Sequence, residues 1–298
     1  MGSKARRPGR KPAIASPAEG RTPTRGRLVV IGGHEEKDAD SIILQEVARQ
    51  ADGGQLLVCT VASDEPEAVW KDYRKAFTRL GVRRVAHLDI DAREDLLTRP
   101  ADGLLDEVRV VFFTGGGQLK ITTRFAGTML CSAVERFYRS GGTVAGTSAG
   151  ASVLADTMLV SGEGESSHRI ATNLLMAPGL GFIRDVLIDQ HFAERGRIGR
   201  LLGAVAQNPR LLGLGIDEDT AVIVDQERTL SVLGSGAVYV ADAREVTYTN
   251  VAEESPERTL SIFDVRLHVL SQGDELSLAS RRPTHNFASS AENGRPRP

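Results

Sequence analysis

Five apolar runs constrain the fold of this 298-residue chain more than any other feature of its sequence. Each run is rich in Val and Ile, nearly continuous in apolar residues, and several end in glycine. A strand covered on one face alternates apolar and polar residues, whereas a continuous apolar run is typical of a parallel sheet that is buried on both faces. The runs that predict strands are residues 27–33, 55–62, 83–90, 108–117 and 142–150.

Helix-like segments separate these runs. We expect helices at residues 38–50, 65–81 and 122–142, the last two of which close on glycine. This alternation predicts an α/β fold with a Rossmann-like, mainly parallel sheet flanked by helices and joined by right-handed crossovers. Beyond residue 205, the strand-like segments 212–242 and 259–278 predict an antiparallel C-terminal extension.

The composition predicts a single domain between two tails. No linker divides residues 27–280, whereas residues 1–26 and 281–298 are rich in Arg, Pro, Gly and Ser and are expected to be disordered. The net charge of −2 gives no reason to expect a nucleic-acid partner. No apolar run reaches the length of about 18 residues that a membrane-spanning helix needs, so no membrane partner is expected.

The two cysteines, Cys59 and Cys131, have neither metal-ligand spacing nor the numbers of a disulfide framework. Because their spacing is not that of metal ligands, we expect no metal. The lack of a disulfide framework favours a reducing compartment, and we therefore expect a cytoplasmic location.

The stretch TVAGTSAGAS, residues 143–152, contains the pattern G-x-S-x-G around Ser148. This pattern is typical of a nucleophile elbow, in which small neighbours permit a sharp turn that exposes the serine hydroxyl and points the next amide, here that of Ala149, at the developing oxyanion. The alternative is a small-residue joint where a helix packs closely on a sheet.

A serine nucleophile needs a base, and six histidines are available. His191 is favoured because it follows an apolar run just before a helix-like segment, as Ser148 does, whereas His168 lies in a polar, loop-like stretch. An acid to orient the base is expected in the cluster of Asp217, Glu218 and Asp219, and the residues alone leave the choice among them open. The order serine, histidine, acid differs from that of the α/β-hydrolases.

Two further segments are expected to shape the pocket. Gly115 to Gly117 end a strand-like run, where bare backbone N–H groups can approach a substrate carbonyl, and Gln118 would point into the same space. Arg195, Arg197 and Arg200 follow His191 and would recognise carboxylates. Their alternative interpretation is a solvated basic face.

The chain resembles the cyanophycinases, serine exopeptidases of the family that also contains the aspartyl dipeptidases. The resemblance covers about residues 27–275 and rests on the ordered motifs VIGGHEEK, FFTGGGQL, GTSAGAS, DQHFAERGRIGRL and GIDEDTA. It implies a fold similar to the class I glutamine amidotransferases, a homodimer, no cofactor, and hydrolysis of cyanophycin, a poly-aspartate that carries arginine on its side-chain carboxyls, to β-Asp-Arg dipeptides through an acyl-enzyme.

The resemblance also implies a role for individual residues. Ser148 would be the nucleophile, His191 the base and Glu218 the acid. The oxyanion donors would be Ala149 and one of Gly116 and Gly117, of which we expect Gly117. The residues that match substrate-pocket positions are Gln118, Asp189, Gln190, Arg195, Arg197 and Arg200. Two alternatives remain at this point: a peptidase of short Asp-containing peptides, and a non-catalytic binding module.

Overall fold

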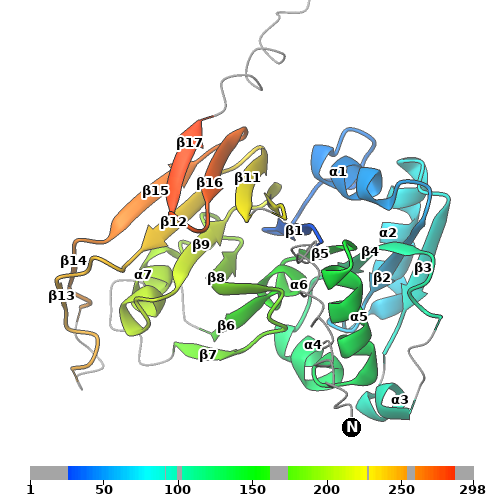
Figure 1. Cartoon of the computed structure of the whole chain (residues 1–298), viewed down its shortest axis with the longest axis horizontal. Helices are drawn as coiled ribbons and strands as arrows, with labels where there is room; N and C mark the ends of the chain where they lie inside the picture. The colour runs from blue at the N-terminus through cyan, green and yellow to red at the C-terminus, as the bar shows by residue number, and fades with distance from the viewer. Residues whose placement is uncertain are drawn as a thin grey trace, which may run out of the picture.

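The computed structural model describes residues 26–90, 92–98, 103–161, 174–226, 228–253 and 259–285. Two β-sheets lie next to each other, with the N-terminal half of the chain around one and the middle of the chain around the other (Figure 1). Residues 1–25 and 286–298 of the expected tails, and His168, lie outside the described residues.

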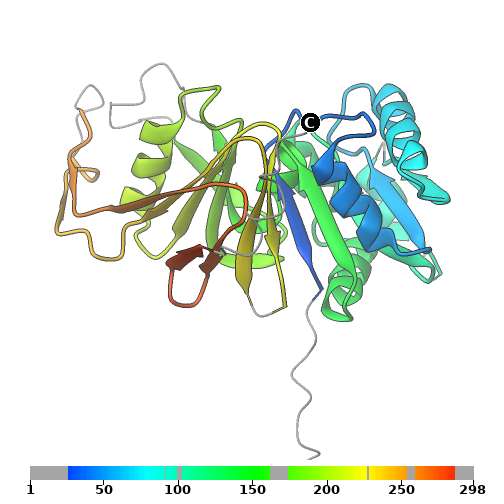
Figure 2. The ribbon, with the colours of Figure 1, turned by 90° about the horizontal axis from the view of Figure 1, so that it is seen from above.

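The larger sheet has nine strands in the order β17-β16-β11-β10-β1-β5-β4-β2-β3. Each of the five apolar runs contains one of its parallel strands: β1 (Leu28–Ile31), β2 (Gln55–Cys59), β3 (Arg84–Leu88), β4 (Val108–Phe113) and β5 (Thr143–Thr147). The other four strands are antiparallel to their neighbours: β10 (Thr220–Val224), β11 (Thr229–Gly234), β16 (Asp274–Ser277) and β17 (Arg282–His285). Figure 2 shows β1, in dark blue, between the yellow antiparallel strands and green β5.

The apolar runs of β1, β2, β4 and β5 are continuous because both faces of these strands are buried, whereas the edge strand β3 is mostly half-buried. Strand β4 shows the burial of both faces directly. Phe112 and Phe113 are both fully buried but point to opposite faces. The ring of Phe112 lies 5.4 Å from that of Phe77 on α2 (Pro66–Arg79), and the ring of Phe113 lies 5.4 Å from that of Phe125 on α4 (Gln118–Phe125). Helices therefore cover this strand on both sides.

The remaining helices complete these layers. They are α1 (Ile42–Ala51), α3 (Arg93–Thr98), α5 (Met129–Arg139), α6 (Ala149–Ser152) and α7 (Ile198–Gln207). The expectation of one helix over residues 122–142 was wrong, because the chain breaks between α4 and α5. Gly127 has a φ of 72° there, and the Thr128 hydroxyl caps α5 by accepting the N–H of Cys131 at 3.2 Å.

The second sheet has six strands in the order β15-β12-β9-β8-β6-β7. They are β6 (Ala155–Ser161), β7 (Leu175–Pro178), β8 (Ile183–Gln190), β9 (Leu212–Ile216), β12 (Val238–Asp242) and β15 (Arg266–Leu270), and a short pair, β13 (Tyr248–Thr249) with β14 (Ile262–Phe263), stands apart from them. Beyond residue 205 the chain therefore adds strands to both sheets in turn, and not to one extension.

One continuous apolar core joins the two sheets. Val30 and Val222 of the large sheet belong to the same buried cluster as Ile188 and Leu214 of the small one. A second cluster packs α1 and α2 on the far face of the large sheet, and a third packs α7 on the small sheet. The turns that end β1, β5, β8 and β9 are thereby held close together.

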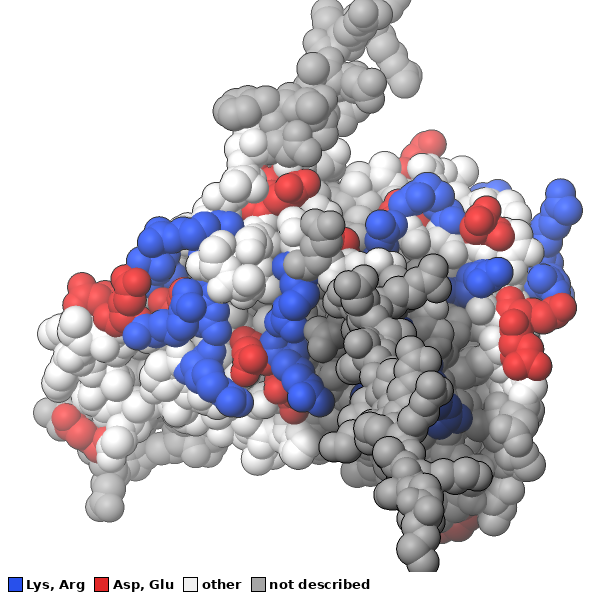
Figure 3. Space-filling model, viewed as in Figure 1, with Lys and Arg blue, Asp and Glu red and all other residues white. Residues whose placement is uncertain are grey.

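Regular structure continues past the expected boundary at residue 280, because β17 pairs with β16. Among the described residues, no helix combines the length and the apolar character needed to cross a membrane. On the face shown in Figure 3, side chains of both charges lie next to one another over the strands at the left.

Candidate active site

Ser148 lies in the tight turn between β5 and α6. Its φ of 53° and ψ of −115° are sparsely populated by non-glycine residues, and such backbone strain costs about 1–3 kcal/mol. The turn requires glycine on both sides of Ser148: a Cβ on Gly146 would lie 2.2 Å from the carbonyl oxygen of Gly150, and a Cβ on Gly150 would lie 2.2 Å from that of Phe113. The Ser148 N–H donates to the Ile31 carbonyl at 3.0 Å, which ties the turn to the end of β1.

His191 directly follows β8 and reaches Ser148. Its Nε2 is 2.9 Å from the Ser148 Oγ, and its backbone N–H donates to the Gly32 carbonyl at 2.9 Å. A Cβ on Gly33, where φ is 110°, would lie 2.3 Å from Cε1 of the imidazole. The glycine turn after β1 therefore leaves the space that this ring occupies.

Glu218 follows β9 and contacts the other side of the imidazole. Its Oε1 lies 2.6 Å from Nδ1 of His191. A carboxylate only accepts hydrogen bonds, so the hydrogen-bond network assigns the ring proton to Nδ1 and leaves Nε2 to accept the hydroxyl of Ser148. Serine, imidazole and carboxylate thus form a continuous chain of hydrogen bonds.

The two neighbours of Glu218 bind other groups instead. Asp217 is buried, and its carboxylate accepts the N–H groups of Ala193 at 2.9 Å and Ala237 at 3.1 Å. Asp219 has a φ of 45° and accepts the hydroxyl of Ser235 at 2.9 Å. Of the three acids in the cluster, Glu218 is the one that reaches His191.

The surroundings of His191 favour its neutral form. Burial lowers the pKa of His191 below its usual range, and the charge of Arg195 and the neighbouring His34 act in the same direction. The hydrogen bond to Glu218 opposes this shift but does not cancel it. The imidazole therefore stays able to accept a proton to a lower pH than an exposed histidine.

A cavity of about 410 Å³ opens beside Ser148. The turn after β1, helix α2 and the ends of several strands form its walls. Its lining residues are His34, Glu35, Lys37, Val69, Asp72, Tyr73, Gly115, Thr147, Ser148, His191 and Arg195.

A buried acid in this wall was not predicted from the sequence. The Glu35 carboxylate is 3% exposed and accepts hydrogen bonds from the hydroxyl of Tyr73 and, at 2.6 Å, from that of Thr147. The ammonium of Lys37 lies 4.9 Å from the centre of the Tyr73 ring. The run of charged residues directly after the first strand was the available signal, since ligand sites in open α/β sheets lie beyond the carboxyl ends of the strands.

The structure separates the residues predicted to bind substrate. Arg195 lines the cavity. The carboxylate of Asp189, which is 1% exposed, binds the guanidinium groups of Arg200 and Arg197, with Nε of Arg200 at 2.7 Å and Nη1 of Arg197 at 3.2 Å. Arg197 also donates to Gln190. These four residues form a network beneath the site, and their polar groups bind one another.

Two other predicted residues also have partners within the fold. The side-chain amide of Gln118 is buried and donates to the Leu159 carbonyl in β6 at 2.8 Å, so it does not point into the cavity. The N–H of Gly117 donates to the Ala62 carbonyl at 2.9 Å. The expected oxyanion role of Gly117 is therefore wrong in this structure, because its donor is already in use.

Ala149 occupies the first position of α6, where helix geometry leaves the N–H groups without intrahelical acceptors. Its amide follows Ser148 directly, as the elbow pattern requires.

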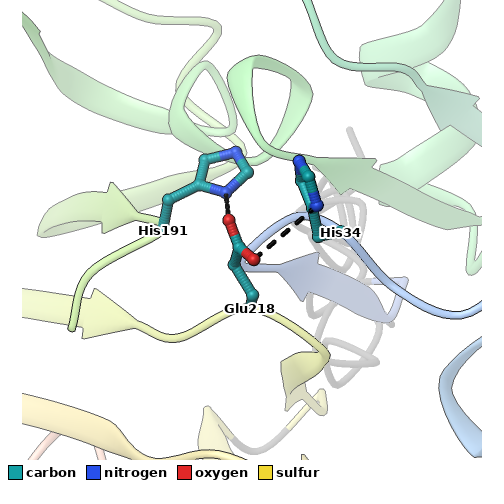
Figure 4. A group of neighbouring side chains, drawn as sticks. All are labelled: His34, His191 and Glu218. Atoms are coloured by element: carbon teal, nitrogen blue, oxygen red, sulfur yellow. Dashed lines mark hydrogen bonds and ion pairs between the residues drawn. The ribbon is translucent and has the colours of Figure 1, made fainter. Parts of the chain in front are cut away.

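One group of side chains in the described part of the chain has the composition and spacing of a metal-ligand set. It consists of His34, His191 and Glu218, which come from the ends of β1, β8 and β9 and converge on one another (Figure 4). Ser148 adjoins the group through its contact with His191. This group therefore overlaps the hydrogen-bonded set described above.

Residues 28–232 match the model of peptidase family S51, and the chain belongs to this family.

Its curated relatives include a cyanophycinase of Nostoc sp., 37% identical over 273 residues, which cover 90% of this chain and 91% of the relative. A cyanophycinase of Synechococcus elongatus is 37% identical over 265 residues, which cover 88% of this chain and 82% of the relative. Among solved structures, a peptidase from an acI-B1 Actinobacterium has a TM-score of 0.61 at 22% identity and covers 86% of this chain and 98% of its own. That likeness supports the α/β peptidase fold.

Proposed function

We propose that this chain is a serine exopeptidase that hydrolyses cyanophycin to β-Asp-Arg dipeptides. The observation that carries the proposal is the hydrogen-bonded set of Ser148, His191 and Glu218, with Oγ to Nε2 at 2.9 Å and Nδ1 to Oε1 at 2.6 Å. The set lies beside a cavity in a chain that is 37% identical to cyanophycinases over about nine-tenths of its length.

In the first half of the reaction, Oγ of Ser148 attacks the carbonyl carbon of a backbone amide. Nε2 of His191 takes the hydroxyl proton as general base and then passes it to the leaving amine. The carboxylate of Glu218 holds the ring by Nδ1 and stabilises the imidazolium that forms. The product is an ester between Ser148 and the acyl part of the cleaved substrate, which water hydrolyses with His191 again as base.

The oxyanion of the tetrahedral intermediate needs N–H donors. Ala149 supplies one from the first turn of α6. Because the N–H of Gly117 binds Ala62, we assign the second donor to Gly116, the neighbouring glycine of the same turn. In such sites one donor contributes about 3 kcal/mol to the stabilisation of the transition state.

The cavity offers charges of both signs to a substrate that carries carboxylate and guanidinium groups. Arg195 and Lys37 supply cations, and Glu35 and Asp72 supply carboxylates. These residues replace most of the substrate contacts that the family resemblance implied, because Asp189, Arg197 and Arg200 bind one another. The guanidinium of the substrate would meet Asp72, whose side chain is exposed.

The rest of the proposal follows from the family resemblance. We expect the sheet around β1 to correspond to the Rossmann-like sheet of the class I glutamine amidotransferases, since the parallel order β3-β2-β4-β5-β1 places the Ser148 turn at the end of a central strand. A homodimer and a cytoplasmic location belong to the same proposal. Both cysteines are free and buried, which fits a reducing compartment.

The test is product analysis with purified protein and insoluble cyanophycin. The wild-type chain is expected to release β-Asp-Arg, identified by mass, and Ser148→Ala to release none above background. Ser152→Ala, in the same short helix, is the matched control and should remain active. Release of dipeptide by Ser148→Ala at the wild-type rate would contradict the proposal, and cleavage of short aspartyl dipeptides but not of the polymer would move it to the other branch of the family.

A further inference from the structure

His34 is the one member of the metal-ligand group that the proposed reaction does not use. It lies in the turn after β1 with a φ of 49°, and its side chain is 72% exposed. Its Nδ1 is 3.7 Å from Oε2 of Glu218, while Oε1 of the same carboxylate binds His191. The two imidazole rings meet edge to face, with centroids 5.3 Å apart. Figure 4 shows Glu218 between the two rings, joined to both.

These three side chains offer a ligand set that suits zinc. Two imidazoles and one carboxylate hold zinc in several metalloenzymes, with a fourth position left for water. One donor atom from each of the three residues lies within 4.8 Å of the other two. Donors around a tetrahedral zinc ion are about 3.4 Å apart. The exposed His34 ring must therefore turn toward the other two ligands, and the 2.6 Å contact between His191 and Glu218 must open by about 0.8 Å to admit the ion.

We propose that His34, His191 and Glu218 bind a divalent transition-metal ion, Zn²⁺ above all, and that the bound ion reversibly inhibits the peptidase. The inhibition, though not the binding, rests on the function proposed above. The ion enters from the solvent side, where His34 is exposed.

Inhibition follows from the proton count on His191. In the active form, Nδ1 carries the proton and Nε2 has the lone pair that takes the proton of Ser148. The nitrogen that faces Glu218 and His34 is Nδ1. When an ion takes the lone pair of Nδ1, the single proton of the neutral ring moves to Nε2. His191 then has no lone pair for Ser148, and Glu218 binds the ion in place of the ring N–H.

Direct binding is measured by isothermal titration calorimetry of the full chain with ZnCl₂. The diagnostic variant is His34→Asn, because asparagine tolerates a positive φ and is a poor zinc ligand. We expect its zinc affinity to fall by about tenfold or more, since loss of a supporting partner alone costs about 10–100-fold. Ser148→Ala keeps all three ligands and should bind zinc as the wild type does. Mg²⁺, which prefers oxygen ligands, should not bind.

The control for other zinc-binding histidines is His285→Ala, which removes an exposed imidazole paired with Asp274 outside this group. It should bind zinc and be inhibited like the wild type. Inhibition of each variant is expressed relative to its own metal-free rate, and EDTA should restore that rate. The half-inhibitory zinc concentration should rise by about tenfold or more in His34→Asn.

Equal zinc affinity in the wild type and His34→Asn, or no binding of zinc to either, would overturn the site. If the chain binds zinc through His34 but releases no dipeptide, the site stands and the proposed function fails. If it releases dipeptide and zinc leaves the rate unchanged although it binds, the ion does not reach Nδ1 of His191 and the inhibitory role is wrong.

Discussion

Arg195 and Arg200 lie five residues apart, yet their side chains have opposite surroundings. Arg195 is exposed and lines the cavity beside Ser148. Arg200 is 6% exposed and binds the buried carboxylate of Asp189. The spacing of the arginines places them in one cationic group, but only the fold shows which of them faces the cavity.

Replacing each of these two arginines by alanine should therefore have different effects. Arg195→Ala is expected to lower kcat/KM by about 10–100-fold, the cost of one charge-assisted contact to a substrate carboxylate, and to leave stability unchanged. Arg200→Ala is expected to lower the free energy of unfolding by about 3 kcal/mol, because it leaves Asp189 with less of its compensating charge. Steady-state kinetics and urea unfolding of both variants check this. A stable Arg200→Ala with weakened substrate binding would place Arg200 in the binding site instead.

The pH dependence of the reaction depends on His191. The reaction needs its neutral imidazole, and burial lowers the pKa of His191. Activity should thus be retained as pH falls below the ordinary histidine value of about 6.5 and be lost only as pH passes through the lower pKa. The measurement is kcat/KM against pH with a soluble substrate. An acidic midpoint above pH 7 would show that Glu218 outweighs burial.

At the scale of elements, the packing of α6 against β4 and β5 fixes the position of Ser148. The backbones approach so closely that a Cβ on Gly146 would lie 2.2 Å from the Gly150 carbonyl oxygen. We expect Gly146→Ala to lower the free energy of unfolding by more than about 3 kcal/mol and to abolish activity, because backbone atoms must move apart. Gly53→Ala is the control, since nothing lies within 4 Å of its added Cβ, and its positive φ should cost about 1 kcal/mol. Equal losses in urea unfolding would contradict this account.

Some of the helices and strands can be predicted from the sequence and others cannot. The five parallel strands could be, because residues such as Phe112 and Phe113 are buried on opposite faces and make the run continuously apolar. The second sheet could not be separated from the first, because a strand's own residues do not specify its partner: β9 and β10 follow each other in the chain but enter different sheets. The break between α4 and α5 depends on the positive φ of Gly127, and the helical spacing of apolar residues does not reveal this angle.

The residues of the candidate site also divide into those that could be predicted from the sequence and those that could not. Ser148 and His191 could be predicted because each directly follows a strand, where open α/β sheets place their ligands. Only the family resemblance selected Glu218. It differs from Asp217 and Asp219 in the direction of its side chain, and the sequence does not specify that direction. Glu35 was missed because its carboxylate becomes a polar wall of the cavity only when Tyr73 and Thr147, far away in the sequence, supply the hydroxyls.

At the scale of the whole molecule, Arg281 connects the two sheets near their C-terminal strands. It lies between β16 and β17 of the large sheet, and its side chain is 8% exposed. Its Nη1 donates to Asp242 at the end of β12 in the small sheet at 2.8 Å, and its Nη2 donates to the Arg210 carbonyl. Asp242 also binds Arg244. Composition assigned this arginine to a tail, yet the fold uses it as an internal cation.

Arg281→Ala should therefore destabilise the protein although it lies at the edge of the sequence-defined domain. The loss should be about 2 kcal/mol, less than the ~3–5 kcal/mol of a pair left wholly without its partner, because Arg244 still binds Asp242. Burial raises the pKa of Asp242, but the hydrogen bonds of Arg244 and Arg281 outweigh burial and hold this pKa below its usual range. This stabilisation is present above the ordinary aspartate pKa of about 3.9 and is lost as pH falls through the lowered value.

Thermal unfolding of Arg281→Ala and of its exposed neighbour variant, Arg282→Ala, tests this. At neutral pH the midpoint should fall by roughly 5 °C for Arg281→Ala and remain unchanged for Arg282→Ala. The difference between Arg281→Ala and the wild type should shrink in acid, where protonation of Asp242 removes the ion pair from the wild type as well. Equal midpoints of both variants at neutral pH would mean that the contacts of Arg281 with Asp242 and with the Arg210 carbonyl add nothing to the stability of the protein.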